Sequence, residues 1–326
     1  MNKSKIDWCD HTWNPITGCY HQCPYCYART MTKRFSGDIK LNLAEDRHRV
    51  YENNSTLSVF ILDEPFPARN GRILPYPFGF APTYHRYRLD MPSKKLVGCK
   101  IFVGAMADVF GSWIPEKWIL EILEACKQAP QHQYIFLTKN PKRYVELASK
   151  GLLPREPNFW YGSTITKVND PMFTAKEYNT FLSIEPLLEP MLNKELMMGV
   201  VGTQQWIIIG AETGKRKDKV RPDTSWFMPT VEAAKELGVP VFYKESLSDI
   251  VGAKNMIQEF PESMTVADFS KKQETKLYTH CGMCKKNKKK SQMTAILGRA
   301  GRGESAIAIG YICDDCFEDF KKGFEK

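Results

Sequence analysis

The sequence of 326 residues predicts an α/β protein whose larger part is a partial (β/α) TIM-like barrel. Three observations predict this class. Short apolar runs rich in β-branched and aromatic residues alternate with helical patterns. Polar residues recur directly after those runs. The hydrophobic fraction of 43% provides ample material for a core, which excludes a disordered chain.

Six apolar runs are predicted to be buried strands, and a possible seventh lies near the amino terminus. The six are Ile101–Ala105, Gln133–Leu137, Phe159–Gly162, Phe181–Ile184, Trp206–Gly210 and Pro240–Tyr243, and the seventh is Thr12–Ile16. Helices are predicted at Pro115–Gln128, Pro141–Lys150 and Thr224–Leu237, the last of them ended by Gly238. This number of strands suits a barrel or partial barrel better than a short open sheet, while a doubly wound sheet remains the alternative.

Two segments interrupt this alternation. Residues 63–92 hold six of the 20 prolines and are predicted to form a long surface excursion. After about Phe260 the alternation stops, so we expect a barrel domain over residues 1–260 and a separate module over residues 271–326. No apolar run approaches the roughly 18 residues of a membrane span, and no secretory signal is visible, so we expect a cytoplasmic protein.

Polar side chains follow each of the six strands predicted after residue 100. They are Asp108, Lys139, Thr164 and Thr166, Glu185, Glu212 and Lys244. In a parallel barrel the carboxyl ends of the strands converge on one face, where active sites are built. A single such residue can simply be the first solvated position after a strand, but the repetition favours one shared site.

Three of the ten cysteines, Cys19, Cys23 and Cys26, have the spacing C-x3-C-x2-C. In a cytosolic chain such close spacing indicates metal ligation rather than disulfide bonding. Three thiolates can bind three irons of a [4Fe–4S] cluster and leave the fourth iron open. A structural zinc site completed by His21 or Cys9 is the alternative.

This segment resembles the cluster motif of the radical S-adenosylmethionine (SAM) superfamily, including the aromatic Tyr25 before the last cysteine. The wider chain resembles a phage-associated branch with a three-cysteine motif, in which WNP-x-TGC opens the chain and CYA closes the motif. The further matches are PTYHRYRL (Pro82–Leu89), IFVGAMADVF (Ile101–Phe110), YIFLTKNPKR (Tyr134–Arg143), FLSIEPLL (Phe181–Leu188), WIIIGAETG (Trp206–Gly214) and VPVFYKE (Val239–Glu245). The resemblance spans about residues 8 to 250.

The resemblance implies a partial (β/α) barrel with the [4Fe–4S] cluster in the loop after the first strand. It implies that SAM binds the open iron and is cleaved to methionine and a 5′-deoxyadenosyl radical, which abstracts a substrate hydrogen. The cofactors then carry the chemistry, while the protein positions them and excludes water. An electron donor for the cluster is required, and a partner protein encoded nearby is a further expectation.

The resemblance also assigns residues by their positions. Tyr25 is expected to touch the adenine of SAM. The segment with Gly104, Ala105 and Asp108 lies where related enzymes hold the methionine amino group. Glu185 and Glu212 are further candidates for SAM binding, and the candidate catalytic residues are Lys139, Glu185, Glu212 and Lys244.

Four more cysteines form two pairs with the spacing C-x2-C-x28-C-x2-C. They are Cys281, Cys284, Cys313 and Cys316. Four thiolates make the closed tetrahedral site typical of structural zinc, and a second iron–sulfur cluster is the alternative. We therefore predict a small C-terminal zinc-binding module, to which Zn²⁺ supplies folding energy because so short a segment has little core.

This module is strongly basic. Residues 271–326 hold thirteen Lys and Arg against seven Asp and Glu, which is +6 of the total net charge of +9. The cations between the cysteine pairs are Lys285, Lys286, Lys288, Lys289, Lys290, Arg299 and Arg302. A basic loop on a zinc module typically faces phosphate, whereas a solvated charged loop is the alternative. We therefore expect a nucleic-acid partner, either tRNA or DNA.

Three functions are compatible with these features. The first is radical SAM modification of a nucleic acid, and the second is radical SAM modification of a peptide or protein. The third is a metal-stabilised nucleic-acid-binding protein without enzymatic activity. The polar residues after the strands favour an enzyme, and the basic module favours a nucleic-acid substrate.

Overall fold

The computed structural model describes residues 1–52, 58–214 and 216–264, together with the strand backbones 278–280, 287–289, 293–298 and 307–313. The chain divides into two compact units, Met1–Val266 and Ala267–Lys326. Within the described ranges, no helix has the length and apolar character needed to cross a membrane.

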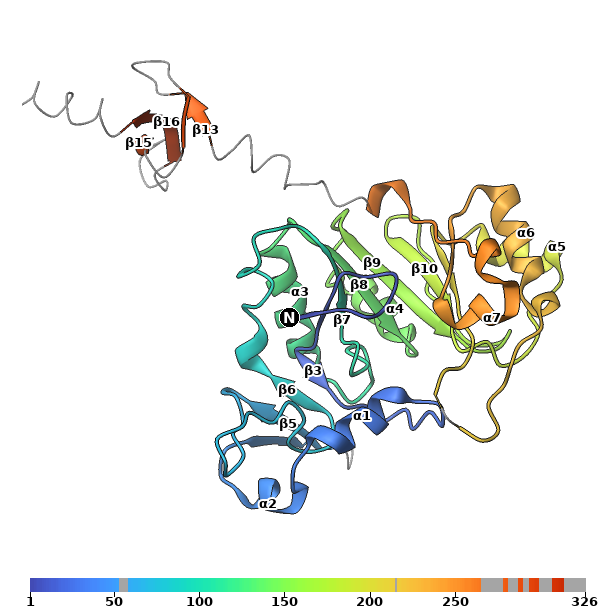
Figure 1. Ribbon diagram of the computed structural model, residues 1–326, viewed down its shortest axis with the longest axis horizontal. Helices are drawn as coiled ribbons and strands as arrows, with labels where there is room; N and C mark the ends of the chain where they lie inside the picture. The colour runs from blue at the N-terminus through green and yellow to red at the C-terminus, as the bar shows by residue number, and fades with distance from the viewer. Residues whose placement is uncertain are drawn as a thin grey trace, which may run out of the picture. The chain divides into compact units, whose positions relative to one another are not determined.

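The first unit is built on an eight-stranded sheet whose strands stand in sequence order (Figure 1). The strands are β1 (Asn2–Lys3), β2 (His11–Trp13), β7 (Lys100–Val103), β8 (Gln133–Thr138), β9 (Phe159–Ile165), β10 (Asn179–Ile184), β11 (Ile207–Ile209) and β12 (Val241–Tyr243). All neighbours pair in parallel except β1 and β2. The predicted α/β class with a mostly parallel sheet is therefore confirmed.

The helices of this unit lie in the connections between the strands. They are α3 (Glu116–Lys127), α4 (Lys142–Ser149), α5 (Lys194–Val201) and α6 (Met228–Leu237), and the short α7 (Ser248–Val251) follows the last strand. The first two and α6 fall within predicted helices, and Gly238 ends α6 with a φ of 67°, as its predicted role as a C-cap requires. Helix α5 was not predicted; its first turn is capped by the Asn193 side chain, which accepts a hydrogen bond from the Leu196 N–H.

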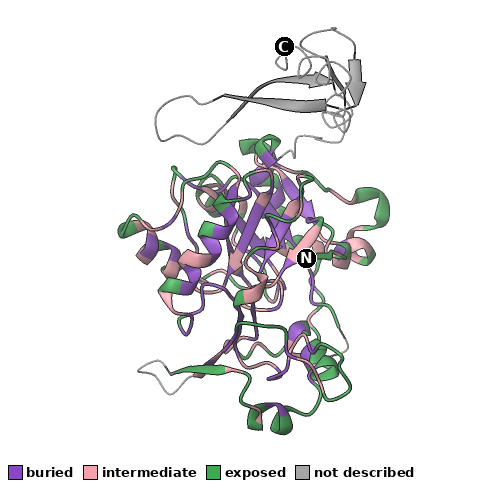
Figure 2. Ribbon diagram, turned by 90° about the vertical axis from the view of Figure 1, so that its left-hand side faces the viewer, coloured by how far each residue is buried: buried purple, intermediate pink, exposed green. Residues whose placement is uncertain are grey.

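Side chains of the strands alternate between two cores, because successive residues of a strand point to opposite faces. One face contributes residues such as Val103, Phe136 and Ile209 to cores that include the buried sides of the helices. The other face contributes one central residue from each strand from β7 to β12. These residues are Phe102, Ile135, Trp160, Phe181, Ile208 and Phe242, and they pack with Trp8, Phe260 and Met264. Figure 2 shows the buried strands at the centre of this unit.

A smaller sheet is inserted between β2 and β7. Its order is β3 (Ile16–Thr17), β6 (Thr83–His85), β5 (Ser58–Leu62) and β4 (Arg49–Glu52), and it is accompanied by α1 (Tyr27–Phe35) and α2 (Ile39–Ala44). The predicted strand Thr12–Ile16 is therefore wrong as a single element: Asn14 and Pro15 separate β2 from β3, which belong to different sheets.

The segment 63–92 is also more ordered than its proline content predicts. It supplies β6 and the 3-10 helix Arg86–Arg88, and it buries Phe66, Leu74 and Phe78 against Leu62. The prediction of an irregular surface excursion is therefore wrong for this part of the chain. Apolar side chains between the prolines build a small core, so the prolines shape a packed loop rather than prevent packing.

The second unit contributes two antiparallel strand pairs. Strand β13 (Tyr278–His280) pairs with β14 (Asn287–Lys289), and β15 (Met293–Gly298) pairs with β16 (Ile307–Cys313). The predicted zinc ligands Cys281, Cys284 and Cys316 and the predicted nucleic-acid contacts Lys285, Lys286, Lys290, Arg299 and Arg302 lie outside the described residues. Cys313, Lys288 and Lys289 lie on described strands, but their side chains are outside the description.

Candidate active site

A cavity of about 230 Å³ opens at the carboxyl ends of the parallel strands. Its wall contains the three cysteines of the N-terminal motif and all eight of the other site residues predicted in the first unit. These are Cys19, Cys23, Cys26, Tyr25, Gly104, Ala105, Asp108, Lys139, Glu185, Glu212 and Lys244. Thr164 also lines the cavity, whereas Thr166 is turned to Asp170, to which its hydroxyl donates at 2.9 Å. The structure thus brings the predicted residues together around one space.

The cysteine loop leaves β3 and ends in α1. Gly18 has a φ of 83° and donates its N–H to the Met106 carbonyl at 2.8 Å, and a Cβ there would overlap the backbone of Ala81. Only glycine can lie this close to the Ala81 backbone, in this conformation, without strain. Gln22, between the first two cysteines, has a φ of 57°, an uncommon conformation for a residue with a side chain. Cys26 then occupies the N-cap of α1.

The Cys19 thiol is half-buried, and burial raises its pKa to about 12. Its sulfur accepts the His21 N–H at 3.5 Å, the kind of contact that tunes a metal-bound thiolate. Cys9, the alternative ligand, is not part of the cavity wall: it is buried and donates to the Ser4 hydroxyl at 3.2 Å. Across the described ranges, no group of three or more His, Cys, Asp or Glu side chains is arranged to hold one metal ion.

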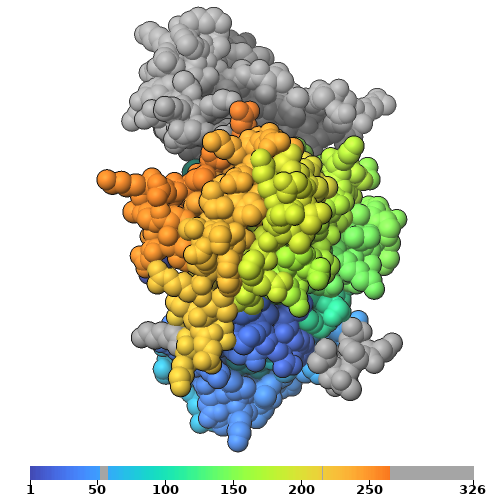
Figure 3. All heavy atoms as spheres, turned by 90° about the vertical axis from the view of Figure 1, so that its right-hand side faces the viewer, coloured from blue at the N-terminus to red at the C-terminus, as the bar shows by residue number. Residues whose placement is uncertain are grey.

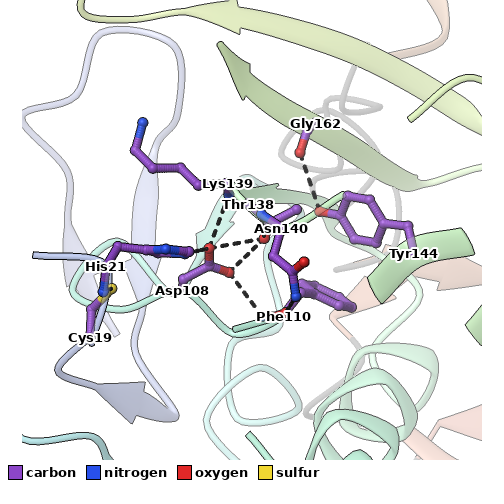
Figure 4. A network of polar contacts seen from close by, with 9 residues as sticks. All are labelled: Cys19, His21, Asp108, Phe110, Thr138, Lys139, Asn140, Tyr144 and Gly162. Atoms are coloured by element: carbon purple, nitrogen blue, oxygen red, sulfur yellow. Dashed lines mark hydrogen bonds and ion pairs between the residues drawn. The ribbon is translucent and has the colours of Figure 1, made fainter. Parts of the chain in front are cut away.

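Asp108 is the centre of a buried polar network at the end of β7 (Figure 4). One carboxylate oxygen accepts from the Phe110 N–H at 3.0 Å and from the Thr138 hydroxyl at 2.7 Å. The other pairs with His21 Nε2 at 2.7 Å and accepts the Lys139 N–H at 3.0 Å. These contacts use the four lone-pair sites of a carboxylate, so Asp108 holds the cysteine loop against β7 and β8.

The other two carboxylates of the cavity are also paired. Glu185 forms an ion pair with Lys244. Arg216 donates to the two carboxylate oxygens of Glu212 through Nε and Nη2, at 2.7 Å each. Glu212 also accepts the Val220 N–H at 3.3 Å. The Arg216 hydrogen bonds lower the pKa of Glu212, so this carboxylate is ionised at neutral pH.

Two polar groups in the wall are not paired in this way. Among the described residues, no ion pair joins the Lys139 ammonium to a carboxylate; it lies 5.4 Å from the centre of the Tyr25 ring, and burial lowers its pKa. The buried Ser183 hydroxyl has no hydrogen-bond partner within the described ranges. A buried polar group without a partner is costly, so both groups are available to a ligand.

Sequence reasoning missed Ser183 and Tyr27 and gave His21 a different role. Ser183 was hidden inside a predicted strand, although a polar residue within an otherwise apolar run was a usable signal. Tyr27 lines the cavity and donates its hydroxyl to the Ala105 carbonyl at 2.6 Å. His21 was considered only as a metal ligand, and no local signal indicates its contact with Asp108, which is 87 positions away.

The family comparison concerns this same unit. A family model described as "Protein of unknown function (DUF5131)" matches residues 3–259. The chain belongs to this family. We find no match to the chain among curated proteins or among solved structures. The range matched by the DUF5131 family contains every residue of the cavity wall and ends before the four C-terminal cysteines.

Proposed function

We propose that the protein is a radical SAM enzyme that modifies a nucleic acid, either tRNA or DNA. In this proposal Cys19, Cys23 and Cys26 hold a [4Fe–4S] cluster, and SAM occupies the cavity beside it. One observation carries the proposal. The three thiols share a single cavity with the polar residues that follow successive parallel strands, which is the arrangement that the resemblance implies.

The residues fit a cubane cluster better than a zinc ion. A cubane binds each thiolate through a different iron, so three thiolates suffice and the fourth iron stays open. A structural zinc ion requires a fourth ligand. The two candidates for that role, His21 and Cys9, have other partners.

The sheet supports the same proposal. Its parallel strands follow one another in sequence order, and the helices of the connections cover one face. A partial (β/α) barrel has this order, whereas in a doubly wound sheet the order of the strands reverses at a switch point. In both arrangements ligands bind at the carboxyl ends of the strands, where this cavity lies.

When bound, a reduced [4Fe–4S] cluster supplies the electron that cleaves SAM to methionine and a 5′-deoxyadenosyl radical. The chain's own residues would bind these cofactors and enclose them. Lys139 and Ser183 offer an ammonium and a hydroxyl to polar groups of a ligand. Ile6, Trp8 and Phe102 form an apolar part of the wall, which excludes water from a reactive species.

The second unit is proposed to hold the substrate. Its four cysteines suit structural Zn²⁺, and the net charge of +6 over residues 271–326 favours an anionic polymer. We propose that this unit binds the nucleic acid through phosphate contacts, which position a strand without reading its sequence.

The test is anaerobic reconstitution with iron and sulfide, followed by reduction in the presence of SAM. We expect about four irons per chain for one cluster and release of 5′-deoxyadenosine. Cys23→Ala should lose both signals, whereas the matched control Cys9→Ala should keep them because Cys9 lies outside the cavity wall. Retention of iron and 5′-deoxyadenosine by Cys23→Ala would contradict the proposal. The substrate is then sought as a mass shift in nucleosides of tRNA or DNA that depends on the active protein.

A further inference from the structure

We propose that the cavity has a nucleic-acid-binding lip, formed by α1 (Tyr27–Phe35) and the segment Arg216–Arg221, which binds a single strand of the substrate. The inference rests on the proposed function for the identity of the reaction. The binding itself is independent of any chemistry in the cavity and lies on the first unit rather than on the basic module.

Both parts of the lip continue directly from the cavity wall. Tyr27 and Ala28, at the start of α1, line the cavity, and so do Glu212 and Thr213, which precede the second part. On the face shown in Figure 3, the gold segment that contains Arg216–Arg221 lies beside blue residues, and Figure 1 shows this gold loop close to the blue loop that leads into α1. The bidentate contact from Arg216 to Glu212 fixes this segment to the wall.

The lip concentrates positive charge. Helix α1 contains Arg29, Lys33 and Arg34 and no acidic residue, which is a net +3. The segment Arg216–Arg221 contains four cations and one aspartate, which is also +3. Residues 1–270 together carry only +3, so the rest of that range has a net charge of −3. The positive excess of the first unit is therefore concentrated in two segments that adjoin the wall of its cavity.

Most of these cations are free to meet a ligand. Lys33, Arg34, Lys217 and Lys219 are exposed, and in the part of the chain that the structure describes none of them forms an ion pair. Unpaired cations at the mouth of a cavity attract an anionic partner and raise its local concentration.

Helix α1 adds a face on which bases can stack. Tyr27, Met31 and Phe35 are four residues apart, so they lie along one side of the helix, and their exposed fractions are 51%, 43% and 39%. Ala28 and Thr32 are the buried residues of this helix. The hydroxyl of Tyr27 is held by the Ala105 carbonyl, which fixes that ring beside the cavity.

Cations beside exposed aromatic rings are the combination that single-stranded nucleic acids use, through phosphate contacts and base stacking. A duplex keeps its bases stacked inside and cannot use the α1 face. An acidic peptide has the charge but no stacking bases. An enzyme that modifies a base must also receive that base outside a helix. An unpaired strand or loop is therefore the occupant that uses both properties of the lip.

The test measures binding of labelled single-stranded RNA and DNA oligonucleotides to the anaerobically purified full chain, without SAM. The variant Lys217→Glu/Lys219→Glu is compared with the control Lys176→Glu/Lys235→Glu. The control changes the net charge equally at two exposed lysines, which precede β10 and β12 and so lie toward the opposite ends of the strands. The second unit is the same in both proteins, so the difference between them reports the lip.

We expect the lip variant to have a Kd about tenfold or more above that of the control. The slope of log Kd against log salt should fall by about 1.4, because each of the two lost phosphate contacts of a single strand contributes about 0.7. Phe35→Ala should weaken binding about fivefold without changing that slope. Equal Kd values for the lip variant and the control would overturn the proposal. Tighter binding of a poly-glutamate peptide than of the oligonucleotides, lost in the lip variant, would overturn the nucleic-acid occupant. Failure of the proposed radical SAM function is a separate outcome, in which the wild-type protein releases no 5′-deoxyadenosine from SAM.

Discussion

The buried carboxylate of Asp108 organises the candidate site, and Asp108→Asn removes one of its two acceptor oxygens. The new amide group would donate toward groups that are themselves donors. On one side these are the Phe110 N–H and the Thr138 hydroxyl; on the other they are the Lys139 N–H and the His21 ring. Either orientation leaves at least one backbone N–H in buried surroundings without its acceptor.

The magnitude follows from these contacts. An unsatisfied buried donor costs about 1–3 kcal/mol, and a hydrogen bond to a charged group contributes about 1.5–3 kcal/mol. We therefore expect Asp108→Asn to lower the free energy of unfolding by about 3 kcal/mol. For a unit of the size of Met1–Val266, an unfolding entropy of about 2.1 cal/mol/K per residue gives about 1.8 °C in Tm per kcal/mol, so the Tm should fall by about 5 °C. Thermal unfolding of the two anaerobically purified proteins, followed by circular dichroism, measures this difference.

The matched control is Asp63→Asn. Asp63 also contacts two cations, Arg49 and Arg86, but its side chain is 52% exposed. Solvent screens such pairs, so we expect a loss below about 1 kcal/mol. If the two substitutions lower the Tm equally, the reasoning that assigns a structural role to the buried network is refuted.

Three further outcomes are expected. Gly162→Ala should cost about 1–3 kcal/mol by overpacking, because a Cβ there would overlap the Phe181 ring, and adding Phe181→Leu should restore part of the lost Tm. The Arg216 contact lowers the pKa of folded Glu212, so its stabilisation is present above the unfolded pKa of about 4.3 and is lost as the pH falls through the folded value. Glu212→Gln should therefore flatten the dependence of Tm on pH in that acidic range. Ser183→Ala removes a buried hydroxyl that has no partner among the described residues, so Tm should stay constant or rise, while the proposed binding of SAM, measured by calorimetry, should weaken.

The class of the fold was predictable because each parallel strand is buried on both faces. Such strands read as continuous apolar runs, and all six runs predicted after residue 100 overlap observed strands. Helix α5 escaped prediction because its sequence KELMMGVV contains Gly199 and two valines, which weaken the helical signal. The packed segment 63–92 escaped prediction because its small core joins apolar residues spaced between the prolines to the adjoining strand β5, and proline content does not reveal that packing.

The gathering of the site residues was predictable for a related reason: carboxyl ends of parallel strands meet at one edge of a sheet. Their pairing was not predictable. Glu212 pairs with Arg216 through the conformation of one loop, and Glu185 pairs with Lys244, which is 59 positions away in the sequence. Sequence could identify Glu185 and Glu212 as residues of the cavity, but only three-dimensional contacts show that each already has a cation.

These pairings narrow what the cavity can bind. Glu185 and Glu212 are neutralised by Lys244 and Arg216, and the lone pairs of Asp108 are used, so in the described chain none of these carboxylates is free to coordinate a hard cation. The wall still offers three thiols, the Lys139 ammonium and the Ser183 hydroxyl. Thiolates select soft or borderline metals, and an unpaired ammonium lowers the cost of the negative charge that thiolate ligands bring. These remaining groups are the ones that the proposed [4Fe–4S] cluster, bound by three thiolates with one open iron, would use.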